Sequence, residues 1–317
     1  MKPEPASIAI CVITFLRPVG LARLLGSFSK LAFKCGPDPD LRIVVVDNDP
    51  AGSARPVAEQ AAAQLAWPLT YAIEPQRGIS FARNRAVALA AGCELLAFVD
   101  DDELAEPEWL DQLVAAQRAH DADVVAGPVA PVFDAPPPAW VLRGQFVGVR
   151  RFGRASRPTG TPIGSASSAN LLVRRSALAG IPGPFHPAFA LSGGSDILLT
   201  RQLARRGARM IWCDEASVAE HVPASRARAG WIIQRAYRVG NTLSRCEGEL
   251  EPSARSAARR ALRGGGLVAL GLAGLLPALL GGRALAVRML AYAARGAGIL
   301  AGLAGHRYEE YQTIHGA

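Results

Sequence analysis

The feature that most constrains this chain is an apolar run that ends in adjacent acids, at residues 95–103 (LLAFVDDDE). The apolar part has the length of a buried strand, so the acids are expected where that strand reaches the edge of its sheet. Open α/β sheets bind ligands at that edge. A hard divalent cation that also binds phosphate would relieve the repulsion between the carboxylates. The pattern predicts a divalent-metal site for a nucleotide; the alternative is an acidic loop capping the helix expected from Pro107.

Strands and helices alternate before the acids. The second strand also ends on an acid, Asp47, and no G-x-G-x-x-G follows the first strand, which argues against a dinucleotide site. The order predicts an α/β fold with a doubly wound, mostly parallel sheet and right-handed crossovers, so the ends of strands one, two and four should meet at one edge. Strands are expected at residues 7–15, 41–46, 69–73 and 95–99, with helices beginning near Leu21, Ser53 and Gly78.

The middle of the chain continues with less regular periodicity. A long loop at 144–168 contains four arginines that either bind an anionic group or form a solvated basic surface. These arginines are Arg150, Arg151, Arg154 and Arg157. Further strands are expected at 123–129, 168–176 and 209–213, and further helices at 107–118 and 196–206.

Length and composition divide the chain. The 317 residues exceed what one α/β domain needs, so we expect a catalytic domain at 1–225 and a helical region at 226–317.

The net charge of +8 suits anionic lipid or a phosphate-bearing substrate, and the absence of an aromatic and basic stacking pattern argues against nucleic acid. The five scattered cysteines argue against zinc and against a disulfide framework. No signal peptide is recognisable, so the globular part is expected in the cytoplasm.

Four motifs in this order resemble those of the inverting GT-A glycosyltransferases of glycosyltransferase family 2. The resemblance covers about residues 7–225 and implies the GT-A type of Rossmann-like sheet. It also implies a nucleoside-diphosphate sugar donor, a Mg²⁺ or Mn²⁺ ion, and inversion at the anomeric carbon. The motifs are residues 13–18 (ITFLRP), 43–48 (IVVVDN), 77–84 (RGISFARN) and 98–102 (FVDDD).

The resemblance assigns donor-binding roles to residues at the strand ends. Thr14 and Arg17 would line the base pocket, and Asp47 would hydrogen-bond the nucleoside. Arg83 would either contact the nucleotide or pair with the acids. Asp101 is counted among the donor-binding acids, although alternation along a strand would turn its side chain away.

The remaining assignments concern the metal and the reaction. Asp100 and Asp102 would be the outer acids of the D-x-D signature, with Asp100 binding the donor and Asp102 binding the metal. His221 stands where related enzymes keep a histidine near the metal and the diphosphate. Asp196 would be the general base, with a simple helix cap as the alternative. Ser195 replaces the usual glutamate before that aspartate, which puts the acceptor contacts in doubt.

The C-terminal region is apolar and basic. Residues 264–282 contain no charged side chain, and as a helix they would be about 28 Å long, close to the hydrocarbon thickness of a bilayer. We expect this tail to hold the chain on the cytoplasmic face of a membrane, with arginines before the run on the cytoplasmic side. Glycines and Pro277 weaken the helix, so interfacial helices or a soluble helical core are the alternatives.

The leading hypothesis is transfer of a sugar from a nucleotide donor to a hydroxyl of a glycan or lipid-linked acceptor, in polysaccharide biosynthesis. A nucleotidyltransferase is the first alternative, but the segment after the first strand is not a Gly-rich basic phosphate loop. The second alternative is a non-catalytic relative that binds sugar or polymer. The presence of both Asp102 and Asp196 argues against that alternative.

Overall fold

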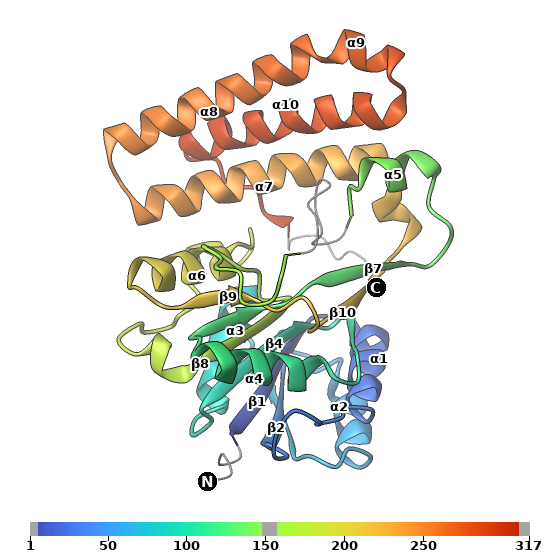
Figure 1. The fold of residues 1–317 in the computed structure, drawn as a ribbon, viewed down its shortest axis with the longest axis vertical. Helices are drawn as coiled ribbons and strands as arrows, with labels where there is room; N and C mark the ends of the chain where they lie inside the picture. Colours follow the sequence, from blue (N-terminus) through green and yellow to red (C-terminus); the bar gives the residue numbers. More distant parts are fainter. Residues whose placement is uncertain (1–5, 148–156, 311–317) are drawn as a thin grey trace.

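The apolar runs of the N-terminal half form parallel strands, as predicted, in the computed structural model of the chain, which describes residues 6–147 and 157–310 (Figure 1). Thr14 pairs with Asp47 and Ile13 with Asp100, so three strand ends meet at one edge of the sheet. The neighbours follow the order β3-β2-β1-β4. These strands are β1 (Ser7–Thr14), β2 (Asp40–Asp47), β3 (Leu69–Ile73) and β4 (Leu95–Asp100).

Three further strands extend the sheet beyond β4. β8 (Asn170–Arg174) runs antiparallel between β4 and β6 (Val124–Ala126), and β9 (Met210–Trp212) pairs in parallel with β6. The mostly parallel seven-stranded sheet confirms the predicted fold class. The arginines Arg150, Arg151 and Arg154 of the predicted loop lie outside the described residues.

The single strand predicted at 123–129 is wrong. The chain leaves the main sheet after β6 at Gly127, where a Cβ atom would lie 2.1 Å from the Ala216 carbonyl oxygen. It then forms β7 (Val129–Phe133) in a second sheet with β10 (Val218–Val222) and β5 (Glu103–Ala105). This second sheet lies beside the acidic end of β4, since β5 follows β4 after two residues.

Helices cover both faces of the main sheet. Alternate residues of β1 face opposite sides, with Ile8, Ile10 and Val12 in one apolar cluster and Ala9 and Cys11 in the other. The first face is covered by α1 (Pro18–Phe28), α2 (Arg55–Ala62) and α4 (Trp109–His120), the second by α3 (Ile79–Leu89) and α6 (Ser195–Arg205). The helix expected to begin near Ser53 is α2, which begins at Arg55 after Ala54, without a side-chain cap.

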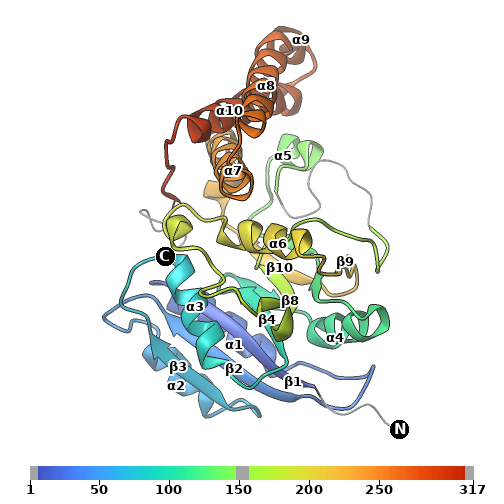
Figure 2. The same cartoon turned by 90° about the vertical axis from the view of Figure 1, so that its left-hand side faces the viewer.

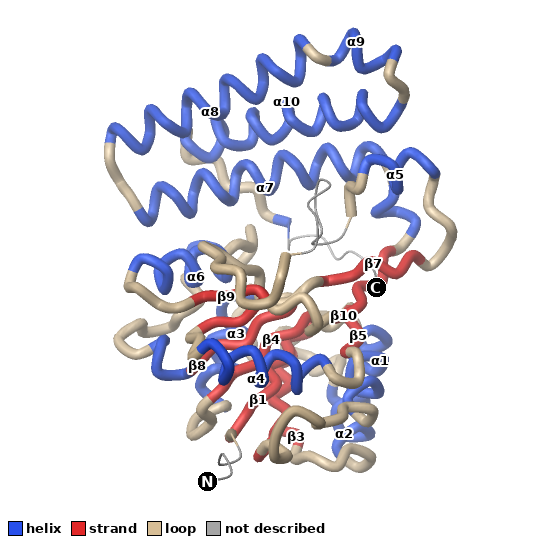
Figure 3. Tube along the Cα trace, viewed as in Figure 1, coloured by secondary structure: helices blue, strands red, loops and turns tan. Residues whose placement is uncertain are grey.

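The C-terminal helices form a layer beyond the carboxyl edge of the sheet (Figures 1 and 2). Small residues allow close packing: a Cβ atom on Gly240 would lie 2.1 Å from the Arg295 carbonyl oxygen, and one on Gly298 would lie 2.0 Å from that of Tyr237. Figure 3 shows this layer built of helices, with the strands and their flanking helices below it. The layer contains α7 (Ala229–Leu250), α8 (Ala254–Ala273), α9 (Leu275–Leu280) and α10 (Arg283–Leu303), and α5 (Ala139–Gly144) packs against α10.

One continuous helix over 264–282 does not form. Helix α8 ends at Ala273, Gly274 separates it from the six-residue α9, and Gly282 adopts a φ of +93° before α10 begins. Within the described residues, the helix that is long and apolar enough to cross a membrane is α10 instead. Because α10 packs against both α7 and α8, length and composition alone do not make it a membrane span.

Candidate active site

The carboxyl end of β4 carries acids that face a cavity of about 510 Å³ between the sheet and the helical layer. Asp100 ends the strand, and its Oδ1 lies 3.2 Å from Nη2 of Arg83, which α3 supplies. The Arg83 guanidinium also lies over the ring of Phe185, 5.6 Å from its centroid. The Glu103 carboxylate accepts a hydrogen bond from the Asp100 amide at 2.9 Å. Arg83 thus pairs with an acid, which is one of its two predicted roles, and it also lines the cavity.

Asp101 and Asp102 form the turn after β4, and arginines from distant segments hold them. Thr14 donates a hydrogen bond to Asp101 at 2.7 Å, and Arg17 approaches Asp101 at 3.1 Å and Asp102 at 3.3 Å. Arg226 lies 3.4 Å from Asp102 on the other side. The Asp101 side chain therefore points toward Thr14 and Arg17 and belongs to the cluster.

Electrostatics at this edge favour a cationic ligand. Burial raises the pKa of Asp100 to about 6, against the lowering effect of Arg83, and the neighbouring Asp102 charge raises it further. Burial also raises the pKa of Asp101 to about 7, although Arg17 lowers it. The pKa of Glu103 rises well above its usual value through burial and the charges of Asp100 and Asp102. Such a cluster gains stability from additional positive charge.

The carboxylate oxygens at this edge fit Mg²⁺ or Mn²⁺ when a phosphate-bearing ligand supplies further oxygen atoms. In the described parts of the chain, no three His, Cys, Asp or Glu side chains converge as a complete ligand set. Mg²⁺ is commonly bound by one or two carboxylates together with substrate phosphates and water. The cavity offers the Asp100, Asp101 and Asp102 carboxylates, so the residues present fit an ion that a phosphate-bearing ligand helps to bind.

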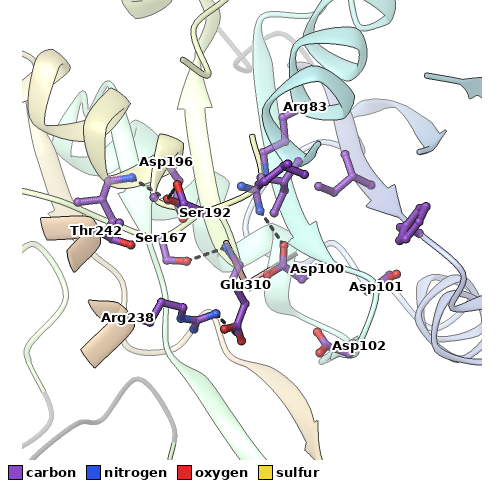
Figure 4. Close-up of a pocket in the computed structure, with 18 of the residues that line it drawn as sticks. Arg83, Asp100, Asp101, Asp102, Ser167, Ser192, Asp196, Arg238, Thr242 and Glu310 are labelled. Carbon is purple, nitrogen blue, oxygen red and sulfur yellow. Dashed lines mark hydrogen bonds and ion pairs between the residues drawn. The ribbon is translucent and has the colours of Figure 1, made fainter. Parts of the chain in front are cut away.

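Asp196 lies across the same cavity, in the first turn of α6 (Figure 4). Its Oδ2 accepts a hydrogen bond from the Ser168 amide at 3.0 Å, and its Oδ1 accepts one from the Ile197 amide at 2.8 Å. The preceding Gly194 has a φ of +95°, and a Cβ atom there would lie 2.1 Å from the Thr242 methyl group. Ser195 is fully buried and does not line the cavity. The site therefore presents one carboxylate, oriented by backbone amides.

The helical layer supplies the wall opposite the acids. Helix α7 contributes Trp231, Arg235, Arg238 and Thr242, and the chain after α10 returns so that Glu310 also lines the cavity. Glu310 pairs with Arg238 at 2.9 Å, as Figure 4 shows. Buried Asn241 fixes this returning segment by donating to the His306 carbonyl at 3.0 Å.

Two predicted site residues do not face this cavity. The buried Asp47 carboxylate accepts hydrogen bonds from the Ala54 amide and the Tyr71 hydroxyl, both at 2.8 Å, and its neighbour Asn48 lines the cavity instead. The His221 ring lies 3.0 Å from Asp134. The structure thus gives Asp47 the role of ordering a loop and directs the His221 side chain away from Asp102.

Several cavity residues escaped the sequence reasoning. In place of His221, the adjacent Glu220 lines the cavity and pairs with Arg226 at 3.0 Å, a contact that depends on strand pairing in the second sheet. The α7 wall did have a signal, because Trp231, Arg235, Arg238 and Thr242 recur at three- and four-residue spacing along one helical face. Glu310 had no such sequence signal, since nothing in the neighbouring residues indicates that the chain after α10 returns to the cavity.

Comparisons with known proteins agree with this architecture. The family described as "Glycosyl transferase family 2" matches residues 9–181. The succinoglycan biosynthesis protein ExoM of Rhizobium meliloti (strain 1021) is 32% identical over 266 residues, which cover 83% of this chain and 82% of that protein.

Solved structures of similar fold cover nearly the whole chain. The mannosyltransferase PcManGT from Pyrobaculum calidifontis, in complex with GDP-Man and Mn²⁺, superposes with a TM-score of 0.64 at 18% identity and covers 95% of this chain and 88% of its own. Residues 1–349 of TarS from S. aureus, in complex with UDP, superpose with a TM-score of 0.52 at 17% identity. This match covers 96% of this chain and 93% of the TarS chain. Together with the sequence matches over more than half of the chain, this fold identifies the protein as a glycosyltransferase that belongs to glycosyltransferase family 2.

Proposed function

We propose that this glycosyltransferase moves a sugar from a nucleoside-diphosphate donor to a hydroxyl acceptor, with inversion and with a divalent metal ion. The observation that carries the proposal is that one cavity contains both the acids at the end of β4 and the separate Asp196 carboxylate. The structures of similar fold support the donor class, because one was solved with GDP-Man and Mn²⁺ and another with UDP.

The acids of β4 would bind the donor. Asp102 would hold Mg²⁺ or Mn²⁺ together with the donor diphosphate, and the ion would neutralise charge that develops on the departing diphosphate. Asp100 and Asp101 complete the acidic edge, while Thr14, Arg17 and Arg83 hold these carboxylates in place. Asp47 would act indirectly, by ordering the loop from which Asn48 reaches the cavity.

Asp196 would act on the acceptor. Its carboxylate takes the proton from the acceptor hydroxyl as that oxygen forms a bond to the anomeric carbon. The bond from this carbon to the donor diphosphate breaks on the opposite face, and its electron pair leaves with the diphosphate. The backbone amides of Ser168 and Ile197 fix the positions of the two carboxylate oxygens.

The acceptor is proposed to be a glycan or a lipid-linked saccharide. The relative ExoM supports this class, since its name places it in succinoglycan biosynthesis. The division into a catalytic domain at 1–225 and a helical region at 226–317 is part of the same proposal, because residue 225 lies in the short 3-10 helix Ala224–Ala227 between β10 and α7.

The helical region is proposed to rest on the cytoplasmic face of a membrane. Seven large apolar side chains of α8–α10 are exposed, including Leu276 at 77% and Leu280 at 94%. The sequence has no acidic residue from 252 to 308, so positive charge flanks these leucines and suits anionic lipid headgroups. This arrangement favours contact along α8 and α9 over a span by α10, which is packed between other helices.

Binding of nucleotide sugars tests the proposed function. Thermal unfolding of the full chain is measured with a panel of UDP- and GDP-sugars, each with MnCl₂ and with EDTA. At least one donor should raise the unfolding temperature in a metal-dependent way, because a ligand that binds only the folded state stabilises it. If no donor stabilised the chain in either condition, the donor-binding role of the β4 acids would be wrong.

A further inference from the structure

A second cavity of about 700 Å³ adjoins the first, on the side away from the acids of β4. It lies between the β6 and β9 part of the main sheet and helices α7 and α10. Ser167, Ala169, Ile197 and Arg295 line both cavities, and Ser167 precedes the residue that holds the Asp196 carboxylate. A ligand in the second cavity can therefore reach Asp196 without crossing the donor edge.

The walls of this second cavity suit a saccharide. Trp212 and Tyr292 line it from opposite regions, one from β9 and the other from α10. The Trp212 ring is fixed, since its Nε1 donates to Asp214 at 3.1 Å. Fixed aromatic rings provide apolar faces while the polar groups nearby hydrogen-bond to hydroxyls.

Arg295 is one of the arginines of this lining, and it also lines the first cavity. Its side chain is partly buried where the two cavities meet, and within the described residues it makes no hydrogen bond or ion pair. By contrast, Arg201 in the same wall pairs with Glu247 at 3.4 Å. Burial lowers the pKa of the Arg295 guanidinium, and the nearby positive charge of Arg263 lowers it further. A partly desolvated cation without an anion is unfavourable, and a bound anion would remove that cost.

We infer that the second cavity binds the acceptor as an anionic saccharide, with Arg295 paired to its phosphate or carboxylate group. This inference rests on the proposed glycosyl transfer, because it is the acceptor hydroxyl that must reach Asp196. The two cavities then divide the substrates: the donor diphosphate lies at the acidic edge of β4, and the acceptor anion lies at the helical layer. Arg295 is a binding residue here and takes no part in bond breaking.

Direct binding of three small probes tests the inference without relying on turnover. Calorimetric titrations use glucose 1-phosphate, glucuronic acid and the uncharged methyl glucoside, on the full chain and on Arg295→Gln, Arg295→Lys, Arg17→Gln and Arg255→Gln. At least one charged probe should bind more tightly than methyl glucoside, and Arg295→Gln should weaken it about tenfold or more. Arg295→Lys should keep most of the affinity, while the exposed control Arg255→Gln should match the parent. The two charged probes distinguish phosphate from carboxylate.

The inference fails if neither charged probe binds, or if Arg295→Gln binds them as the parent does. Loss of binding in Arg17→Gln, with Arg295→Gln unaffected, would place the anion at the donor edge and would also overturn it. Thermal unfolding of each variant confirms that it is folded, and Arg295→Lys covers the case in which the glutamine variant is unstable. Metal-dependent donor binding is measured on the same samples, so a failure of the proposed function is seen separately.

Discussion

The two walls of the cavity differ in chemistry and in origin. The sheet side presents carboxylates, because four parallel strands bring their ends to one edge and β4 ends in consecutive acids. In the described residues, the helical side presents three arginines and one acid, Glu310, which pairs with Arg238. The difference indicates that one cleft is built to receive two unlike groups: a cation with its phosphates at the sheet, and an anion at the helices.

The two walls also differ in how they are held together. Pairs between arginine and carboxylate fix the acids of the sheet edge, as Arg83 does for Asp100 and Arg17 for Asp101. The helical layer is held by close approach of glycine-containing backbones, and its outward face leaves leucines exposed. The sheet wall is therefore sensitive to loss of charge, whereas the helical wall is sensitive to added volume and to loss of apolar surface.

The largest effect is expected from Asp196→Asn. The amide keeps the shape of the side chain but cannot take the acceptor proton, so transfer should fall roughly 10²- to 10⁴-fold. Donor affinity, measured by titration, should stay near the parent value because Asp196 lies across the cavity from the β4 acids. Transfer at the parent rate would reduce Asp196 to a helix-capping role.

Asp102→Asn should have a smaller effect on the opposite wall. Loss of one charge from an oxygen-ligand site should weaken metal-dependent donor binding about 10- to 100-fold, with turnover falling in parallel. Titration of the donor with MnCl₂ measures this, and EDTA should reproduce the loss in the parent. Undiminished transfer in EDTA would remove the metal from the account.

The exposed leucines of the helical layer should matter only at a membrane. Replacing Leu276 or Leu280 with serine should weaken binding to phosphatidylglycerol vesicles by about tenfold or more each, because a buried leucine contributes about 1.5–3 kcal/mol. Val19→Ser is the matched control, since Val19 is 70% exposed on α1. Equal losses in the control and the leucine variants, measured by vesicle sedimentation, would refute a membrane face on α8 and α9.

The smallest effect is a stability difference between two glycines. Gly194 and Gly207 have similar φ values of +95° and +85°, but only at Gly194 would a Cβ atom meet another group, the Thr242 methyl at 2.1 Å. Alanine at either position should cost about 1 kcal/mol or more in backbone strain. Gly194→Ala should lower the free energy of unfolding further, because the N-terminus of α6 packs against α7 there. Equal losses in denaturant unfolding would show that this contact is loose.

Sequence reasoning predicted the sheet wall well because its signals are local. The apolar runs of β1 to β4 and the acids after β4 each lie within a few residues of the feature they determine. The residue that pairs with each acid was harder to predict from the sequence. Arg83 was recognised from its motif, while Arg226 depends on a 3-10 helix far along the chain.

The two errors among the predicted site residues each concern a choice between neighbouring residues. In the antiparallel pairing of β10 with β5, Glu220 lies opposite Glu103. This register turns the Glu220 side chain toward the cavity and the His221 side chain toward Asp134. A register shift of one residue would have exchanged the orientations of Glu220 and His221, and a single sequence does not specify the register. Asp47 and Asn48 present the same choice at the end of β2, decided by the Ala54 amide and the Tyr71 hydroxyl, which bind the Asp47 carboxylate.

If the β4 acids and Asp196 act on opposite faces of one anomeric carbon, the product must have the inverted configuration. The most direct measurement is therefore ¹H NMR of the first product formed from an α-linked nucleotide sugar by the full-length chain. A β-linked product from the parent enzyme, absent in Asp196→Asn, is the expected result. An α-linked product would contradict displacement across this cavity, even if donor binding and metal dependence were as proposed.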